Sequence, residues 1–312
     1  MTHRSSASPA ASRSTLRPSI RSLLAGIVDY AGLFPPASLA MAPAVAEYAA
    51  QRGGDEAWML ARFIVPVSRL DEFEAAMSQH RREDDTTWPL SALPGTELGP
   101  ARKAIDAFHE RVGDAARVES IEMRAPSADD ISRGARTFDG FEVYYELDHR
   151  SDPRPLMEAV AQQGGAAKIR TGAVVADAIP TTAEVARFLR TAAEVGIPLK
   201  ATAGLHHPVR AEHALTYEDD APRGVMHGFL NVFLAAALAR SRDQPALDEA
   251  TLEDLLDERD PRAFAVSGDA VSWRGHTVDS ASLDAARHQF AHSFGSCSFA
   301  EPVDDLRALR LL

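Results

Sequence analysis

The chain has 312 residues, 45% of them apolar and 25% charged, an ordinary composition for one large globular domain. Its net charge of −12 argues against nucleic acid or an anionic membrane as the main partner. The longest apolar run, residues 225–239, is shorter than the roughly 20 residues of a membrane helix and predicts a buried helix instead. The only cysteine, Cys297, excludes an intrachain disulfide and a cysteine-based metal site, and it favours a reducing, cytoplasmic compartment.

The first 57 residues are expected to form an N-terminal arm, tail and cap. Residues 1–28 contain no aspartate or glutamate and are rich in arginine and serine, which is typical of a loose tail and is shared with organelle transit peptides. Residues 29–36, from Asp29 to Pro36, precede the first predicted strand. We expect them to form either a plug or lid over a site, or a packed N-terminal arm.

From residue 58 to residue 312 the sequence alternates a short apolar run, a turn and a helical segment. This alternation is the pattern of a parallel sheet with crossover helices. Ser127 and Thr181 are predicted helix N-caps, and Glu184 completes a capping box with Thr181. The strands are expected at residues 61–66, 88–93, 118–123, 141–147, 166–170, 199–203 and 294–299.

The strand between the sixth and the last of these is ambiguous, because only residues 264–266 or 271–273 are suitable. An incomplete barrel, or an insertion at this position, is therefore allowed. An open doubly wound sheet normally carries a glycine-rich first turn, which this sequence does not contain. We predict an α/β fold with a (β/α)8 TIM-type barrel.

Ionisable residues inside the predicted strands are the main indication of a site. Side chains two positions apart share one face of a strand, and burial against the helices would be costly for a charge. Their strands end at the C-terminal face of the barrel, where barrel enzymes have their active sites. The same-face sets are Glu122 with Arg124, Tyr144 with Glu146 and Asp148, Lys168 with Arg170, and Lys200 with Thr202.

Two of the three lysines of the chain, Lys168 and Lys200, fall in predicted strands. A lysine beside a second cation in a desolvated site has a lowered pKa, and its neutral amine is a nucleophile. We therefore expect Lys200 to form a Schiff base, Lys168 to lower its pKa, and Glu146 and Glu122 to transfer protons. The alternative is a charged core layer in which the two lysines merely pair with the two glutamates.

Residues 199–204, with the sequence LKATAG, resemble the lysine strand of deoxyribose-phosphate aldolase and related class I aldolases. In that family the sixth barrel strand carries the imine-forming lysine, which the resemblance assigns to Lys200. It also implies carbon–carbon cleavage of small phosphorylated or carboxylated carbonyl compounds, and an acidic residue on strand four that corresponds loosely to Glu146. The family has a second lysine on the following strand, whereas here the companion, Lys168, lies on the preceding predicted strand.

Anion recognition has two candidate places. Arg170, with Thr171 and Gly172, ends the fifth predicted strand and suits a two-pronged contact with a carboxylate. The small residues 295–298 end the last strand, where backbone N–H groups can approach a phosphate; alternatively they form a tight turn before a helix. Cys297 is interpreted as a buried, inert thiol. The expected substrate-binding residues are Arg170, Thr171, Thr202, Arg124, Gly295, Ser296 and Ser298.

A divalent metal is the alternative to the Schiff base, with His206, His207, His227 and Asp148 as its ligands. A second alternative is a barrel that binds a small anion without turning it over. The preferred hypothesis is a cofactor-free, lyase or aldolase-like enzyme that acts on a small anionic carbonyl compound. Self-association is allowed, but no surface is indicated.

Overall fold

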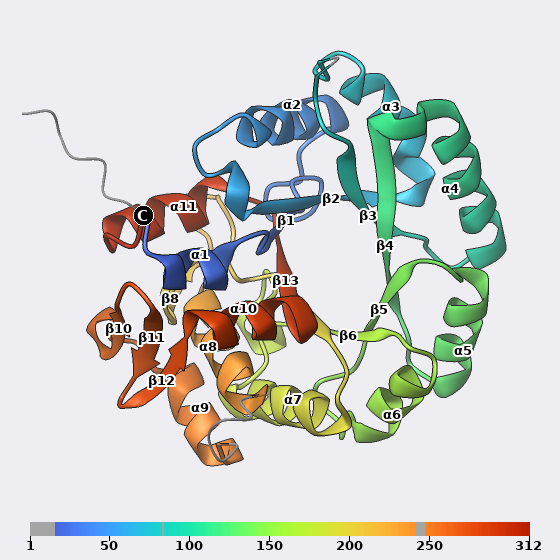
Figure 1. Ribbon diagram of the computed structural model, residues 1–312. Helices are drawn as coiled ribbons and strands as arrows, with labels where there is room; N and C mark the ends of the chain where they lie inside the picture. The colour runs from blue at the N-terminus through green and yellow to red at the C-terminus, as the bar shows by residue number, and fades with distance from the viewer. Residues whose placement is uncertain (1–15, 83, 241–246) are drawn as a thin grey trace, which may run out of the picture.

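The protein folds as a closed (β/α)8 barrel of the TIM type (Figure 1), which confirms the predicted fold class. The structure is a computed structural model that describes residues 16–82, 84–240 and 247–312. Within these residues, neighbouring barrel strands are parallel and follow the order β1-β13-β7-β6-β5-β4-β3-β2. The barrel strands are β1 (Val28–Tyr30), β2 (Leu60–Pro66), β3 (Trp88–Leu93), β4 (Ala116–Arg124), β5 (Glu142–Glu146), β6 (Ala166–Arg170), β7 (Leu199–Thr202) and β13 (Ala291–Ser296).

Helices surround the barrel (Figure 1), and outward-facing side chains of its strands belong to the buried apolar core. On β6, for example, Ala167 and Ile169 are fully buried in the apolar core. The predicted caps are confirmed, because Ser127 accepts a hydrogen bond at its helix start and Thr181 forms a capping box with Glu184. The helices are α1 (Pro18–Leu24), α2 (Met41–Arg52), α3 (Leu70–Met77), α4 (Leu98–Val112), α5 (Ala128–Thr137), α6 (Arg154–Gln162), α7 (Thr182–Val195), α8 (Phe229–Arg240), α9 (Glu249–Asp257), α10 (Ser280–Gln289) and α11 (Ala300–Ala308).

The barrel begins earlier in the chain than the sequence patterns indicate. Val28–Tyr30, in the segment expected to be an arm, is the strand that closes the barrel between β13 and β2. Pro18–Leu24, within the expected loose tail, is helical and partly buried. Residues 1–15 of that tail lie outside the described residues. A three-residue strand with a charge at its centre has no recognisable apolar run, which is why the pattern missed it.

The strand expected at residues 264–266 or 271–273 is not part of the barrel. Phe264–Val266 (β10), Ala270–Trp273 (β11) and His276–Asp279 (β12) form a separate antiparallel sheet. They belong to a long insertion between β7 and β13, so the closed barrel with an insertion is correct and the incomplete barrel is wrong.

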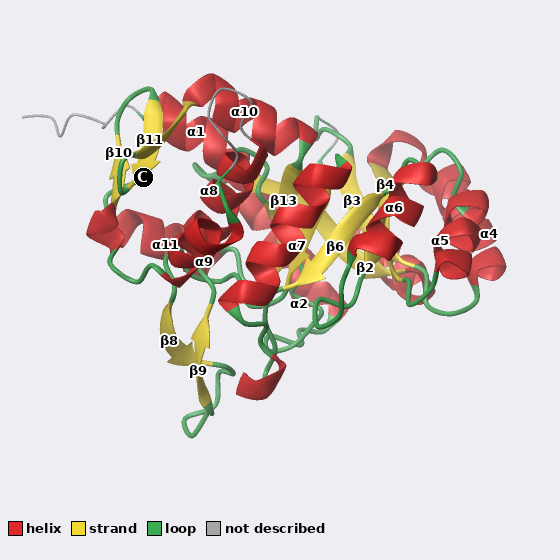
Figure 2. Cartoon of the chain, turned by 90° about the horizontal axis from the view of Figure 1, so that it is seen from below, coloured by secondary structure: helices red, strands yellow, loops and turns green. Residues whose placement is uncertain are grey.

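The insertion has two further parts. Residues 225–239 were expected to form a buried helix, and α8 begins at Phe229 with every residue to Ala239 buried. The antiparallel hairpin of β8 (Ala211–Ala214) and β9 (Arg223–Met226) projects at the end of the molecule opposite β10 and β11 (Figure 2). None of the described helices combines the length and the apolar character needed to cross a membrane.

Gly172 and Gly204 let the loops after β6 and β7 approach each other closely. A methyl group on Gly172 would collide with the backbone of Gly204, where no flexible side chain can move aside. We expect Gly172→Ala to lower the free energy of unfolding by about 1–3 kcal/mol, because the two loops must separate. Urea denaturation measures the change.

Gly99→Ala is the matched control for this substitution. A methyl group on Gly99, in the first turn of α4, would meet open space. Alanine is the better helix residue by roughly 0.5–1 kcal/mol, so this variant should be as stable as the wild type or slightly more stable. Equal stability of Gly172→Ala and Gly99→Ala would contradict the close approach of the loops.

Candidate active site in the barrel mouth

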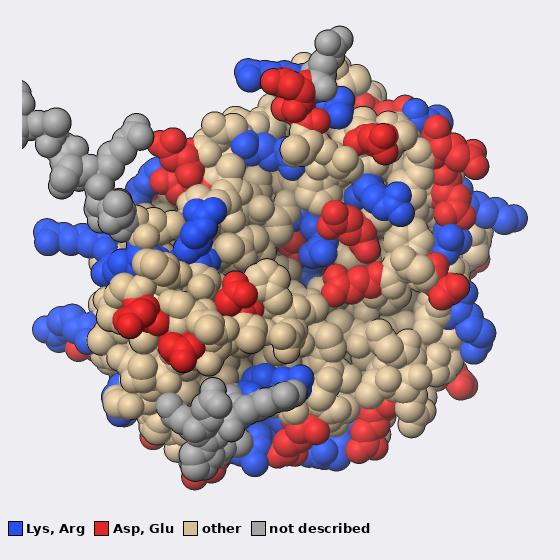
Figure 3. All heavy atoms as spheres, in the orientation of Figure 1, with Lys and Arg blue, Asp and Glu red and all other residues tan. Residues whose placement is uncertain are grey.

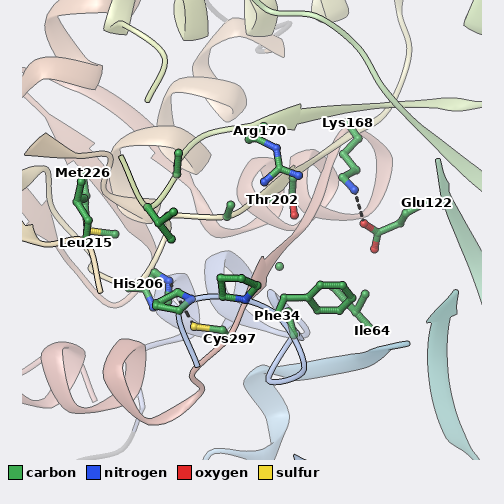
Figure 4. Close-up of a pocket in the computed structure, with 18 of the residues that line it drawn as sticks. Phe34, Ile64, Glu122, Lys168, Arg170, Thr202, His206, Leu215, Met226 and Cys297 are labelled. Atoms are coloured by element: carbon green, nitrogen blue, oxygen red, sulfur yellow. Dashed lines mark hydrogen bonds and ion pairs between the residues drawn. The ribbon is translucent and has the colours of Figure 1, made fainter. Parts of the chain in front are cut away.

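A pocket of about 360 Å³ opens at the C-terminal ends of the barrel strands. Glu122, Lys168 and Arg170 line one side of it, and Figure 4 shows Lys168 and Glu122 turned toward each other there. Phe34 and Leu215 contribute apolar surface from the loop after β1 and from the insertion. A largely apolar pocket with a few convergent charges is the usual form of a small-molecule site.

Below this opening, Lys200 on β7 is fully buried between two carboxylates. Its Nζ lies 2.5 Å from Oδ2 of Asp29 on β1 and 2.6 Å from Oε1 of Glu122 on β4. Ser293 donates to the same oxygen of Asp29 at 2.5 Å, and the backbone N–H of Arg62 donates to the other at 3.0 Å. Lys200 therefore links strands from opposite parts of the barrel wall.

Lys168 continues the chain of ion pairs toward the pocket. Its Nζ lies 2.8 Å from Oε2 of Glu122 and 3.1 Å from Oε2 of Glu146. Nε of Arg170 lies 3.3 Å from Oε1 of Glu146. The charges thus alternate in the order Asp29, Lys200, Glu122, Lys168, Glu146, Arg170 from the buried interior to the mouth.

The expected lowering of the Lys200 pKa is wrong. Burial alone would lower the pKa of Lys200, but the negative charges of Asp29 and Glu122 outweigh it and raise the pKa above the usual value. Burial would likewise raise the pKa of Glu122, yet the ammonium groups of Lys168 and Lys200 hold that pKa well below its usual range. The deep layer is therefore a set of charged pairs, as the alternative of a charged core layer supposed.

Hydroxyl groups and an aromatic ring complete the surroundings of these charges. Ser91 donates to Oε1 of Glu122 at 2.7 Å, and Ser120 donates to Ser91 at 2.9 Å. Nζ of Lys200 lies 5.3 Å from the centre of the Tyr144 ring, within the range of a cation–π contact. Sequence reasoning missed Asp29, Ser91 and Ser293. The only signal was a charged residue between apolar neighbours in the case of Asp29.

Arg170, Thr202 and Gly295 line the pocket, and the Arg170 side chain is 40% exposed. Arg124 is much more exposed and lies 3.5 Å from Glu146, beside a neighbouring pocket that Asp148 also lines. Arg170 therefore lines both the pocket in the barrel mouth and the neighbouring pocket.

The other expected anion-binding hydroxyls are used within the protein. Thr171 is buried, and its hydroxyl donates to the carbonyl oxygen of Ala203 at 2.7 Å. Ser296 donates to the carbonyl oxygen of Ser298, whose own hydroxyl accepts from the backbone N–H of Glu301 in α11. Gly295 and Ser296 thus end β13, and the hydroxyls of Ser296 and Ser298 support the tight turn before α11 that was the alternative for this segment.

The residues of the alternative metal site are not grouped together. His206 pairs with Glu301, and His207 pairs with Asp305. The remaining two ligands are elsewhere: His227 contacts the carbonyl oxygen of Pro180, and Asp148 accepts from Arg150 and Ser151. Across the described ranges, no three histidine, cysteine, aspartate or glutamate side chains are arranged to hold a metal ion.

Ala203, at the end of β7, has a φ of 60° and lines the pocket. This left-handed backbone is costly for a residue with a Cβ, and such strain is concentrated at binding and catalytic sites. The strain lies between Thr202, which lines the pocket, and Gly204, which packs against the neighbouring loop.

A second group of charges lies at the opposite end of the barrel, where the strands begin. Figure 3 shows charged side chains near the centre of this face. Here Arg62 pairs with Glu119 at 3.1 Å and with Glu142 at 3.4 Å, and His292 contacts Glu142 at 3.1 Å. Charged groups at this end of a barrel serve stability in characterised enzymes, so the mouth remains the candidate active site.

Comparison of the sequence with known protein families gave no match, and comparison with curated proteins gave no significant one.

The ion pairs of Lys200 lead to a prediction on stability. Lys200→Met leaves the buried Asp29 and Glu122 without their shared cation, and we expect it to lower the free energy of unfolding by about 3–5 kcal/mol. Adding Asp29→Asn removes one of the uncompensated charges, so the double variant should be more stable than Lys200→Met alone. Chemical denaturation of the set gives the coupling energy of the pair.

Lys103→Met is the control for this series, because Lys103 is exposed on α4. A substitution on the surface should change stability by no more than about 0.5 kcal/mol. If Lys200→Met were as stable as Lys103→Met, the buried network would not hold the barrel together.

Proposed function

We propose that this protein is a lyase that cleaves a carbon–carbon bond in a small anionic carbonyl compound through a Schiff base on Lys168. The observation that supports this choice is the position of the Lys168 ammonium, which lines the pocket and lies between two carboxylates that each have a second cation. Lys168 therefore replaces Lys200 as the proposed nucleophile. Lys200, with a raised pKa and no exposed surface, is a poor one.

The two lysines differ in whether their carboxylate partners also pair with another cation. If Lys168 loses its positive charge, Glu122 keeps Lys200 as a partner and Glu146 keeps Arg170. If Lys200 loses its charge, the donors left to the buried carboxylate of Asp29, within the part of the chain that the structure describes, are the Ser293 hydroxyl and the backbone N–H of Arg62. Lys168 is therefore the lysine whose reaction with a carbonyl group leaves no carboxylate of the network without a cation.

Imine formation also preserves the local charge. The ammonium of Lys168 and a carbonyl compound give a protonated imine and one water molecule, so the positive charge remains at the same nitrogen. Glu122 and Glu146, at 2.8 and 3.1 Å from that nitrogen, then stabilise the iminium as they stabilise the ammonium. The iminium is the electron sink that carbon–carbon cleavage requires.

Glu146 is the proposed acid and base of the cleavage step. Lys168 and Arg170 more than offset the effect of burial and hold the pKa of Glu146 below its usual value, so it is a carboxylate at neutral pH. It takes the proton of the substrate hydroxyl while the electrons of the breaking bond move to the iminium, which gives an aldehyde and an enamine. Protonation of the enamine and hydrolysis then release the second product and restore Lys168, while Arg170 holds the substrate anion.

The strand numbers that the aldolase resemblance implies fit Lys168 better than Lys200. With β1 counted, Lys168 lies on the sixth barrel strand and Lys200 on the following strand, as the family pattern implies for the imine lysine and its companion. The acidic residue on the fourth strand is then Glu122 rather than Glu146. The local similarity at residues 199–204 is to the imine-lysine strand itself, so it supports Lys200, and Lys168 is supported by its strand number alone.

A non-catalytic anion binder is the second candidate. It is favoured by the two carboxylates around Lys168, which stabilise its charged form and so oppose attack on a carbonyl group. The pocket would then bind the same class of anion through Lys168 and Arg170 without forming a covalent bond.

Borohydride trapping tests the proposed imine. Incubation with small carboxylated aldehydes and ketones, followed by borohydride, should add the reduced substrate to Lys168, because borohydride fixes an iminium as a stable secondary amine. Peptide mass spectrometry identifies the site without ambiguity, since the chain has only Lys103, Lys168 and Lys200.

Lys168→Arg is the matched variant, because it keeps a positive charge but cannot form the imine. It should lose the adduct and all cleavage activity, whereas Lys103→Arg should keep both. An adduct on Lys200, or an adduct that persists in Lys168→Arg, would refute the assignment. Binding of a substrate anion with no adduct on any lysine would identify the binder.

A further inference from the structure

Cys297 lies in the same pocket, on the side away from Lys168. It follows β13 in the turn before α11, and it is buried apart from the surface that lines the pocket. Figure 4 shows Cys297 beside His206, at a different part of the pocket from Lys168 and Glu122. The pocket therefore contains a thiol that the proposed imine chemistry does not use.

His206 contacts this thiol on one side of its ring and Glu301 on the other. Nε2 of His206, in the loop after β7, is 3.9 Å from Sγ of Cys297. On the other side of the ring, Nδ1 of His206 lies 2.6 Å from Oε2 of Glu301 in α11. A thiol, an imidazole and a carboxylate in this order form the general arrangement of an activated nucleophile with its base and its orienting group.

Tyr217, which belongs to the insertion, contacts both Cys297 and Glu301. Its hydroxyl lies 3.6 Å from Sγ of Cys297 and donates to Oε2 of Glu301 at 3.2 Å. Burial is the main cause that raises the pKa of Tyr217, so the hydroxyl keeps its proton and donates it to Glu301.

We propose that Cys297 is a second nucleophile of this pocket, activated by His206 and Glu301, and that it adds to the carbonyl carbon of a small aldehyde carrying an anionic group. In this step the thiolate sulfur forms a bond to the carbonyl carbon, the π electrons move to the oxygen, and the oxygen takes the proton from Nε2 of His206. The product is a hemithioacetal, nothing is oxidised or reduced, and no group leaves. This site does not require an imine on Lys168.

The charge on His206 supports this chemistry. Burial would lower the pKa of His206, but the hydrogen bonds to Cys297 and Glu301 outweigh it and raise the pKa to about 9. The imidazole therefore carries both protons at neutral pH, with one directed at the thiol and one at Glu301. A neighbouring imidazolium favours the thiolate, which is the reactive form of cysteine.

The class of substrate follows from the other groups in the pocket. Lys168 and Arg170 supply positive charge to the same cavity, and Leu215 and Met226 supply apolar surface near the insertion. An aldehyde with a carboxylate at its far end can place the anion at Arg170 while its carbonyl group faces the thiol. The cavity, at about 360 Å³, has room for a molecule of this kind.

Alkylation of the full-length protein is a direct test, because all thiol modification must occur at the single cysteine. At neutral pH, iodoacetamide should modify Cys297 at least about 10-fold faster than it modifies N-acetylcysteine, since His206 and Glu301 lie beside the thiol as its base and orienting group. Succinic semialdehyde, an aldehyde that carries a carboxylate, should slow this modification in proportion to its occupancy. A rate below that of N-acetylcysteine that rises on unfolding in urea would show an inert, buried thiol and overturn the proposal.

His206→Asn should lower the alkylation rate at least about 10-fold, because the thiolate loses its imidazolium partner. Glu301→Gln is a second variant for the case in which His206→Asn fails to fold, and it should lower the rate in the same direction. His207→Asn is the matched control, since His207 pairs with Asp305 and should leave the rate unchanged. Equal rates in the His206, Glu301 and His207 variants would overturn the activation by His206.

The two proposals for this pocket can fail separately. Borohydride trapping on Lys168 is repeated in Cys297→Ser, and thiol reactivity is measured without borohydride. An adduct on Lys168 together with an unreactive thiol overturns only the role of Cys297. A fast thiol that succinic semialdehyde protects, without any lysine adduct, supports the role of Cys297 and leaves Lys168 as an anion-binding residue.

Discussion

The ammonium group of Lys200, sealed inside the barrel, is the constraint on which the arrangement of the strands depends. An unpaired charge in this position would cost several kcal/mol, so Asp29 and Glu122 must be held within contact distance of it. These partners come from β1 and β4, which are well separated in the wall of the barrel. The requirement also explains how a strand as short as β1 keeps its place: Asp29 is tied to Lys200 and Ser293 as well as to the backbone of β2.

The same pairing gives the two interior lysines different chemistry although they are partners in the register of β6 and β7. Lys200 pairs with two carboxylates, and for one of them, Asp29, it is the only ion-pair partner among the described residues, so the fold fixes the charge of Lys200. Lys168 shares both of its carboxylates with other cations, and one of these cations, Arg170, reaches the solvent. In the proposed reaction, an iminium at Lys168 would replace its ammonium while Glu122 and Glu146 keep their other cations. The fold thus supplies a buried layer of ion pairs, and Lys168 lies between this layer and the pocket.

The sequence was sufficient for the barrel class and for the face on which the interior charges lie, because alternation within strands is a strong local signal. It was not sufficient for the strand count. Val28–Tyr30 is too short and has a charge at its centre, so the count began one strand late and Lys200 was assigned to the sixth strand. The sign of the Lys200 pKa shift was missed for the same reason, since Asp29 lay in the supposed arm. Contacts such as that between His206 and Cys297 join positions 91 residues apart, and no spacing rule in one sequence reveals them.

One side of the pocket consists of barrel strands, and the other consists of the insertion and the loop after β1. This difference bears on how the site would select a substrate. The side with Glu122 and Lys168 is made of barrel strands cross-linked by buried ion pairs, so it has little freedom to adapt. The opposite side takes Leu215 and Met226 from the insertion and Phe34 from the loop after β1. Loops of this kind vary and move more readily than the strands that carry them. If the pocket binds an anion as proposed, the rigid side carries the charges that would recognise it, and the apolar surface comes from loops that can change without disturbing the ion pairs beneath.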